Sequence, residues 1–327
     1  MRHYFQYSSL TLLLFCLLLL SVLVMPASAE VNLSVGGGYL AGETQYQIGG
    51  RTIDASGTTN LHFPISELNF PLDAFMVKGQ VDASFKDRWS LMASAATNLT
   101  DDTGKMKDSD WGVVSSPDTL DIYSESDTEM DALLLEGKVA YVLYEGYYGQ
   151  TAVNGDTADS DLRFSYTVGL GYKYQKFDFD ISDLDQWYPS APADPHDLVA
   201  GLVATYEAEY QIPYLEVGMV MNAADKFLLE ISFAYAPLVD FQDEDQHLLR
   251  DKVSIADHDW NGTAAFINLK GRYKLTPRWH LGGTFEGLQI ESEGRSNAYF
   301  GGVWDHSIEH EIESHQYSAF LSLGCSF

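Results

Sequence analysis

The sequence predicts an all-β protein whose strands form a ten-stranded antiparallel transmembrane β-barrel. Three observations predict this fold: apolar and polar residues alternate with a period of two, no long apolar run follows the N-terminal segment, and long acidic connections alternate with shorter ones. A period of two is typical of a β-strand with two different faces. In a membrane barrel the apolar face meets lipid and the polar face lines the interior.

Residues 1–29 are expected to be a signal peptide. Arg2 provides a basic start, residues 10–25 are almost entirely apolar, and Ala27-Ser28-Ala29 has the small side chains of a cleavage site. The alternative is an uncleaved anchor helix. Cleavage would leave one domain, residues 30–327, and would remove one of the 19 basic residues and none of the 47 acidic ones. No later segment has the run of about 18 to 20 apolar residues that a membrane helix needs.

The alternation is clearest in residues 75–85, 164–174, 204–214 and 317–327. In each segment, aromatic, aliphatic or small side chains share one face, which we expect to meet lipid. The last segment alternates up to Phe327, and a final strand that ends in an aromatic residue resembles the signal read by the bacterial outer-membrane assembly machinery. The sequence therefore predicts a barrel of the outer membrane.

Nine polar connections set the number of strands. The long, acidic ones are residues 49–60, 101–121, 183–197, 242–252 and 293–305. The shorter ones are residues 86–88, 144–159, 222–225 and 276–278. Five long connections alternating with four shorter ones give ten strands, with the short turns in the periplasm and the long loops outside. Ten strands enclose an interior too narrow for a wide aqueous pore.

Composition excludes several classes of protein. Lys and Arg number 19 against 47 Asp and Glu, so nucleic-acid binding is excluded because phosphate contacts need an excess of cations. The 43 aromatic residues (20 Tyr, 17 Phe and 6 Trp) exclude intrinsic disorder. Of the two cysteines, Cys16 lies in the leader, which leaves Cys325 alone and excludes a disulfide scaffold.

Two of the expected external loops carry a possible catalytic group. Asp108 and Asp110 lie in one, and Asp243, Asp245 and His247 lie in the other. Residues two apart share a face of an extended chain. A histidine oriented by an aspartate can act as a general base that activates water. The alternative is that these acidic loops are only solvated surface, because such pairs arise easily in so acidic a chain.

Other polar clusters are weaker candidates for a functional site. Six residues near the C-terminus could be interpreted as metal ligands, but they have no established ligand spacing, and no metal site is predicted. They are His306, Glu309, His310, Glu311, Glu313 and His315. His258 and Asp259 are expected at a polar rim.

Several segments together resemble the omptin family, ten-stranded outer-membrane aspartate/histidine proteases. Ser66-Glu67-Leu68-Asn69-Phe70 is similar to the start of the family's second strand, residues 212–247 match its spacing without a gap, and residues 273–277 resemble a turn of the family. Asp108 and Asp110 fall on the family's paired aspartates. Asp245 and His247 fall on its Asp-His dyad.

The resemblance implies an endopeptidase in the outer membrane of a Gram-negative bacterium, with its active site facing the cell exterior. Water activated by the dyad and the aspartate pair would attack the peptide carbonyl. Asp243 falls on one acidic position of the S1 pocket, whereas Tyr46 stands where the family has Glu. We therefore expect cleavage after basic residues, Arg above Lys, in cationic peptides or proteins, with less stringency than two carboxylates would give.

The resemblance also implies that activity requires lipopolysaccharide bound to the outer wall of the barrel. Lys176 matches one basic position of that site, and it follows the lipid-facing parity of Tyr172 and Tyr174 just past the aromatic band. Ala256 replaces another basic position and weakens the match.

One pattern conflicts with this assignment. Counting by twos from Phe227 places Asp243, Asp245 and His247 on the lipid side, although a functional dyad must face the interior. The strand therefore needs a bulge or break, and Pro237 is the natural place for it.

Two further functions are compatible with the sequence. One is a catalytically silent adhesin or surface protein of the same fold, and the other is a small outer-membrane channel. Host-matrix binding that survives loss of His247 would favour the adhesin, and conductance in planar bilayers would favour the channel.

Overall fold

The computed structural model describes residues 30–85, 88–148, 152–153, 156–157, 162–224 and 226–327. The expected signal peptide, residues 1–29, lies outside the described residues. Within the described part of the chain, no helix is long and apolar enough to cross a membrane. The strands are β1 (Glu30–Asp54), β2 (Gly57–Asn60), β3 (Ser66–Pro71), β4 (Ala74–Phe85), β5 (Trp89–Asn98), β6 (Asp102–Trp111), β7 (Leu120–Tyr148), β8 (Ala152–Val153), β9 (Asp156–Thr157), β10 (Leu162–Trp187), β11 (Asp197–Ala223), β12 (Phe227–His247), β13 (Lys252–Asp257), β14 (Gly262–Lys274), β15 (Trp279–Phe300) and β16 (Val303–Ser326).

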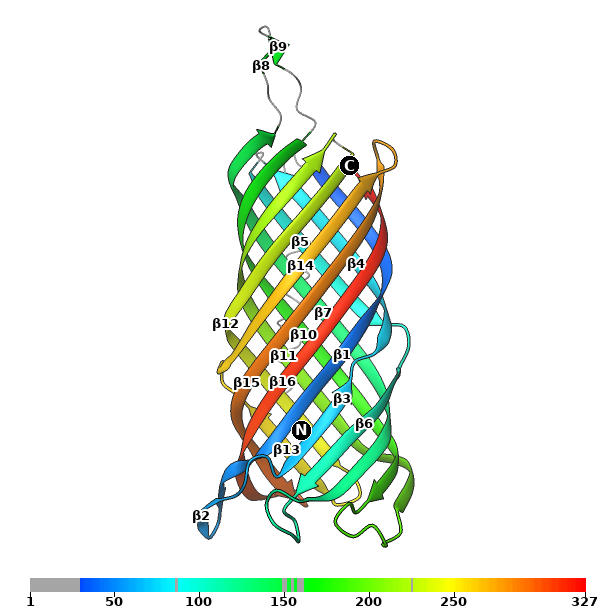
Figure 1. Ribbon diagram of the computed structural model, residues 1–327, viewed down its shortest axis with the longest axis vertical. Coiled ribbons are helices and arrows are strands. Elements are labelled where there is room, and N and C mark those ends of the chain that lie inside the picture. The colour runs from blue at the N-terminus through cyan, green and yellow to red at the C-terminus, as the bar shows by residue number, and fades with distance from the viewer. Residues whose placement is uncertain (1–29, 86–87, 149–151, 154–155, 158–161, 225) are drawn as a thin grey trace.

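The strands close into a ring of ten, which confirms the predicted fold (Figure 1). Neighbours in the ring are antiparallel, in the order β1, β4, β5, β7, β10, β11, β12, β14, β15 and β16. The first and last strands close the ring, with Asn32 paired to Ser326. Towards the other end, β3, β6 and β13 take the places of β4, β5 and β14.

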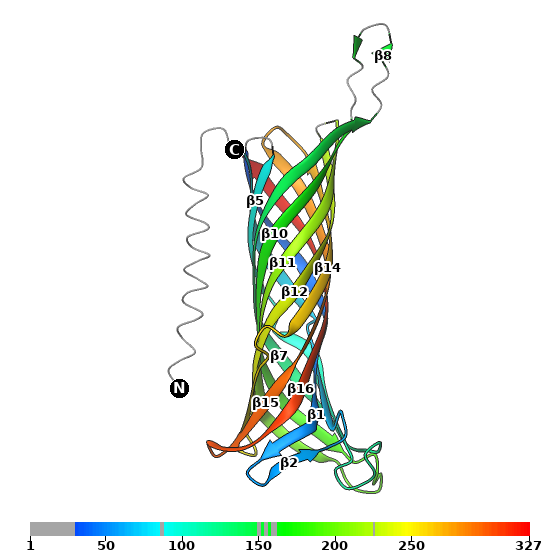
Figure 2. The same ribbon diagram turned by 90° about the vertical axis from the view of Figure 1, so that its left-hand side faces the viewer.

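A belt of exposed apolar side chains surrounds the half of the barrel nearer Glu30 and Phe327. It includes Val35, Phe75, Leu170, Val217, Phe233 and Leu321. This apolar belt is the surface that lipid would cover. The long connections lie at the opposite end, whereas the β8–β9 hairpin lies at the end that carries the C-terminus (Figure 2).

Residues 204–214 correct one expectation about the faces. Their apolar side chains point into the barrel, not towards lipid: Tyr206 and Tyr210 are buried, while Glu207 and Glu209 alternate with them on the outer wall. The reversal has a physical reason. This part of β11 extends beyond the apolar belt, where the outer wall faces a polar environment and the interior is packed with aromatic rings.

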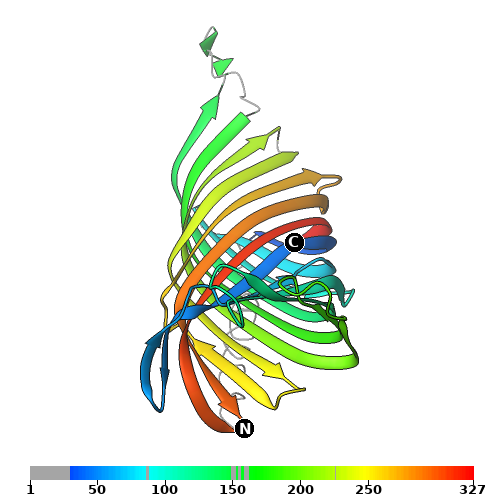
Figure 3. The same ribbon diagram turned by 60° about the horizontal axis from the view of Figure 1, so that its bottom comes forward.

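The long acidic segments are also less loop-like than expected. Residues 102–111 form β6, and residues 242–247 are the end of β12. The strands continue well past the apolar belt and curve around the interior (Figure 3). Their sequences are polar because one face is exposed to water, so polarity alone does not mark the end of a strand here.

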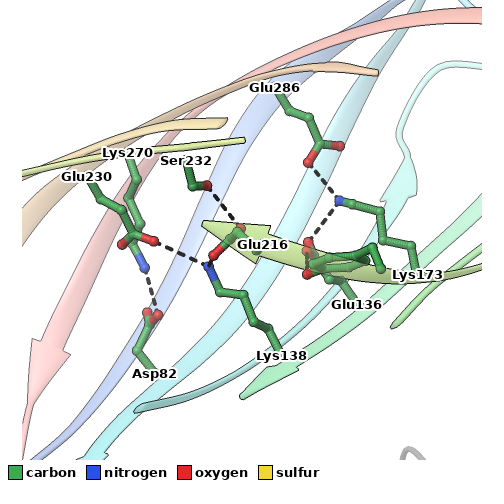
Figure 4. Close-up of polar contacts among 10 residues, drawn as sticks. Asp82, Glu136, Lys138, Lys173, Glu216, Glu230, Ser232, Lys270 and Glu286 are labelled. Atoms are coloured by element: carbon green, nitrogen blue, oxygen red, sulfur yellow. Dashed lines mark hydrogen bonds and ion pairs between the residues drawn. The ribbon is translucent and has the colours of Figure 1, made fainter. Parts of the chain in front are cut away.

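Ion pairs cross the barrel interior at the level of the apolar belt (Figure 4). The pairs are Lys138 Nζ with Glu216 Oε1 (2.8 Å) and Glu230 Oε1 (3.2 Å), Lys173 Nζ with Glu136 Oε2 (3.0 Å) and Glu286 Oε2 (2.7 Å), and Lys270 Nζ with Asp82 Oδ1 (2.6 Å). Several of them join strands that are not neighbours in the ring, such as β10 with β15 and β14 with β4. They therefore bridge the narrow interior that ten strands enclose.

Candidate active site

A one-residue bulge in β12 turns the candidate residues into the barrel. Tyr235 pairs with Leu215 of β11, but Asp240 pairs with Gln211, so β12 has one residue more than its neighbour in this interval. The pairing with β14 shifts at the same place, between Ala236 and Val239. Pro237 and Leu238 are both exposed, whereas the residues on either side are buried. The predicted break at Pro237 is confirmed.

Because of this bulge, Asp243 and Asp245 are buried inside the barrel, beyond the apolar belt. His247 Nε2 lies 3.0 Å from Asp245 Oδ2, and 18% of its side chain is exposed, against 4% for Asp245. His247 therefore lies between the buried Asp245 carboxylate and the space that solvent can reach. A histidine in that position can exchange a proton with water while the carboxylate orients it.

Tyr46 reaches the same carboxylate from β1. Its hydroxyl donates to Asp245 Oδ2 at 2.6 Å. Burial raises the pKa of Asp245, but the charge and hydrogen bond of His247, followed by the hydrogen bond from Tyr46, outweigh it and hold the pKa below its ordinary value. Tyr46 thus contacts the dyad directly, a role that the S1 assignment did not predict.

The aspartate pair lies on β6, and its residues pair with β3. Asp108 is opposite Leu68, and Asp110 is opposite Ser66. One oxygen of Asp108, Oδ1, is buried and has no hydrogen-bond partner. Burial, followed by the charges of Asp110 and Asp245, raises the pKa of Asp108 well above its ordinary value. Burial also raises the pKa of Asp110, against a hydrogen bond from Ser66.

The charges of the Asp-His dyad affect the pKa values of the aspartate pair, so the two predicted pairs lie near each other. The charge of Asp245 acts on Asp108, and the charge of His247 acts on Asp110. The four residues come from strands β6 and β12, which are not neighbours in the barrel. The arrangement combines a solvent-accessible imidazole, an ionised carboxylate behind it and a carboxyl group with a high pKa. Such groups, whose pKa values are pushed apart, are suited to acid–base chemistry.

Asp243 is enclosed by three donors. Its Oδ2 accepts from the Tyr206 hydroxyl at 3.1 Å and lies 3.3 Å from His310 Nε2, while its Oδ1 accepts from the backbone N–H of Ala256 at 3.1 Å. The ring of Tyr46 lies beside two of these partners, with centroid distances of 5.5 Å to Tyr206 and 5.2 Å to His310. Asp243 and Tyr46 are therefore near each other, as their expected S1 roles require.

Sequence reasoning missed the two histidines behind Asp243. His258 was expected at a polar rim, but it is buried, and its Nε2 lies 2.8 Å from His310 Nδ1. The turn after β13 folds His258 inward, and its backbone N–H donates to the Phe241 carbonyl. Alternation along β16 could have found His310, because it shares the buried face with Ile312 and Ser314, whereas Glu313 and His315 are on the other face.

The structure gives the surroundings of the two positions that the resemblance implied for lipopolysaccharide. Lys176 lies on the outward face, but its Nζ is 3.0 Å from both Asp178 Oδ1 and Glu207 Oε2, so two carboxylates already neutralise it. Ala256 is not on the outer wall at all, because it pairs with Asp243 and is buried beside it. The position that matches the family's other basic residue is therefore not on the lipid-facing wall. That Lys176 contacts lipopolysaccharide stays a prediction.

Comparisons with known proteins agree with this fold. The structure is similar to the outer membrane protease OmpT from Escherichia coli, with a TM-score of 0.73, 19% sequence identity, and coverage of 91% of this chain and 97% of that one. The outer membrane protein OprG from Pseudomonas aeruginosa gives a TM-score of only 0.36 at 11% identity, covering 90% of this chain and 95% of that one. The sequence matched none of the curated proteins with which it was compared. The model of the Omptin family matches residues 27–286, so this outer-membrane β-barrel belongs to the omptin family.

Proposed function

We propose that this barrel is an omptin-type endopeptidase that hydrolyses peptide bonds with an activated water. One observation carries the proposal: Asp108, Asp110, Asp245 and His247 come from distant strands and lie within electrostatic reach of one another, beyond the apolar belt. The resemblance to a protease supports the same reaction. By the strand count, the site opens to the cell exterior.

In this proposal each nitrogen of His247 has its own role. Nε2 faces Asp245 Oδ2 at 3.0 Å and carries the proton, so Nδ1 is left to accept a proton from water. As the water oxygen attacks the peptide carbonyl, the proton passes to Nδ1, and the ionised Asp245 stabilises the imidazolium. The imidazolium then returns the proton to the leaving amine.

The aspartate pair supplies the acidic half of the site. With its raised pKa, Asp108 can hold a proton that it shares with Asp110, as two close carboxyl groups commonly do. The partly exposed Asp110 would present this shared proton to the water or to the carbonyl oxygen on which negative charge develops. Polarising the carbonyl in this way lowers the barrier to attack.

The proposed substrates are cationic peptides or proteins cleaved after basic residues. The excess of 47 acidic over 19 basic residues draws cations to the barrel, an effect that salt screens. At the P1 position, the residue before the scissile bond, a basic side chain would meet Asp243 and the ring of Tyr46. A guanidinium stacks on a phenol ring better than an ammonium does, which favours Arg over Lys.

The test is to incubate refolded protein with a mixed peptide library, with and without lipopolysaccharide, and to sequence the products. His247→Ala and Asp245→Asn should each lower turnover by about 100-fold or more, while inhibitors directed at serine or cysteine nucleophiles have no effect. His315→Ala is the matched control, because His315 forms a 2.8 Å pair with Glu313 on the outer face of β16. Wild-type turnover in a variant lacking both Asp245 and His247 would end the proposal.

A further inference from the structure

Two buried histidines take no part in the proposed reaction, yet they form one hydrogen-bonded row with Asp243. His310 of β16 and His258 of the β13–β14 turn are each 2% exposed. His310 Nε2 lies 3.3 Å from Asp243 Oδ2, His258 Nε2 lies 2.8 Å from His310 Nδ1, and Ser292 Oγ lies 2.7 Å from His258 Nδ1. The row joins the floor of the expected S1 pocket to the wall of the barrel.

The carboxylate fixes the direction of the protons along this row. Burial raises the pKa of Asp243 well above its ordinary value, against the hydrogen bonds from Tyr206 and Ala256. In its ionised form Asp243 accepts, so His310 donates from Nε2 and accepts at Nδ1. His258 donates to that nitrogen from Nε2, and it accepts at Nδ1 from the Ser292 hydroxyl. Burial lowers the pKa of His258 to about 4 and that of His310 well below its ordinary value, so both rings are neutral at pH 7. The row thus gives Asp243 one N–H and no positive charge.

This donor leaves Oδ2 of Asp243 with no free acceptor position, and the side chain as a whole is only 3% exposed. Oδ1 is occupied by the Ala256 N–H, and Oδ2 is shared by the Tyr206 hydroxyl and His310. Neighbouring rings hold the imidazole in place, with centroid distances of 5.2 Å from His310 to Tyr46 and 6.3 Å to Phe241. A cationic side chain that approached Asp243 would have to displace His310 from a packed position.

We propose that His310, held by His258, is the specificity-determining residue of the S1 pocket. Its N–H occupies the Asp243 oxygen that a basic P1 side chain requires, so the enzyme's preference for basic over uncharged P1 side chains is weak. This inference rests on the proposed peptidase function. It adds that strict selection for basic residues is suppressed by a neutral histidine row, and that loss of the imidazole restores it.

The test compares two peptides that differ only at P1, with arginine in one and norleucine in the other. His310→Ala opens Asp243, so the ratio of kcat/KM for arginine over norleucine should rise about tenfold or more. His310→Gln retains an N–H donor and should keep the wild-type ratio. The double variant His310→Ala/Asp243→Asn should lose the gain. His315→Ala on the same strand serves as control, and the mobility of unheated protein in SDS gels shows that each variant is folded.

A binding measurement separates this inference from the proposed function. The same two peptides, N-methylated at the scissile bond and labelled for fluorescence anisotropy, report S1 selection without turnover. We expect His310→Ala to favour the arginine peptide by the same factor in Kd. An unchanged arginine-to-norleucine ratio in a folded His310→Ala protein would overturn the inference, whether or not the peptides are cleaved. Absence of cleavage with a shifted binding ratio would overturn only the proposed reaction.

Discussion

The hydroxyl of Tyr46 donates to Asp245 Oδ2 at 2.6 Å, across the interior of the barrel from β1 to β12. The same oxygen lies 3.0 Å from His247 Nε2, so one buried carboxylate atom is shared by two side chains from strands that do not pair. The bond links the first strand of the barrel to the dyad, and it constrains both the position and the charge of Asp245.

Tyr46→Phe should therefore lower kcat/KM by about tenfold, the cost of one lost hydrogen bond to a buried charged group. Without the hydroxyl, the pKa of Asp245 rises, because one of the groups that lower it is lost. Because Asp245 must be ionised to stabilise the imidazolium, the acid limb of the rate profile should move to higher pH. Rates measured with one peptide across the pH range test this, with Tyr39→Phe on the lipid face of the same strand as control. An acid limb in the wild-type position would contradict the role of Tyr46.

Asp108→Asn should stabilise the protein while removing most of its activity. The pKa of Asp108 is raised by burial and by its acidic neighbours, so the unfolded chain loses this proton at a lower pH than the native protein does. The destabilisation caused by ionising the buried Asp108 is absent below about pH 4 and grows as pH rises towards the native pKa. We expect a gain of about 1–3 kcal/mol in unfolding free energy at pH 8 and none at pH 3.

Urea unfolding in lipid vesicles at these two pH values measures the effect. Asp118→Asn is a suitable control, because Asp118 is exposed in the loop between β6 and β7. An equal gain at both pH values would show that the effect is packing and not ionisation.

His258 should make the folded state sensitive to acid. Its pKa falls from 6.5 to about 4 on burial, so the native protein binds fewer protons than the unfolded chain between these values. Stability should therefore decrease as pH falls from 6.5 to 4, by about 3 kcal/mol from this residue. His258→Asn should flatten that part of the curve of unfolding midpoint against pH. A wild-type slope in this variant would show that another residue causes the acid sensitivity.

Lipopolysaccharide should bind more tightly when Lys176 is freed from its carboxylates. The two ion pairs at 3.0 Å with Asp178 and Glu207 compete with any lipid phosphate, so Asp178→Asn/Glu207→Gln should lower the Kd, and Lys176→Ala should change it little. Lipopolysaccharide titration of both variants, followed by tryptophan fluorescence, decides this. Strong weakening by Lys176→Ala would support the lipid role that the resemblance implied.

Deletion of Leu238 should leave a folded and active barrel. The deletion removes the extra residue of β12, so the pairing with β11 and β14 can continue without a shift. Because the extra residue and the bulge are lost together, Asp240 still pairs with Gln211, and Asp245 and His247 still point inward. Insertion of one glycine after Leu238 without a second bulge should instead reverse the facing of the later side chains and abolish activity. Peptidase activity together with unheated gel mobility tests both variants, and an inactive but folded deletion variant would contradict this account of the bulge.

Alternation and turn chemistry predicted the strands and their number, because both depend on residues close together in sequence. The parity conflict at residues 243–247 also appears in the sequence, and it located the bulge at Pro237. The same reasoning failed where contacts join distant segments. The Tyr46–Asp245 bond spans 199 positions, and the His258–His310 contact spans 52. A period of two shows which residues of a strand share a face, but not which strand lies across the barrel from them.

The ion pairs that bridge the interior at the level of the apolar belt also determine which end of the barrel a peptide can use. Lys173 joins β10 to β7 and β15, between the candidate site and the end where the chain terminates. A peptide that reaches the dyad from the outside would therefore leave by the opening through which it entered. On the proposed function, the bacterium's own periplasmic proteins are separated from the dyad by this charged partition, and the protease needs no inhibitor to protect its host cell.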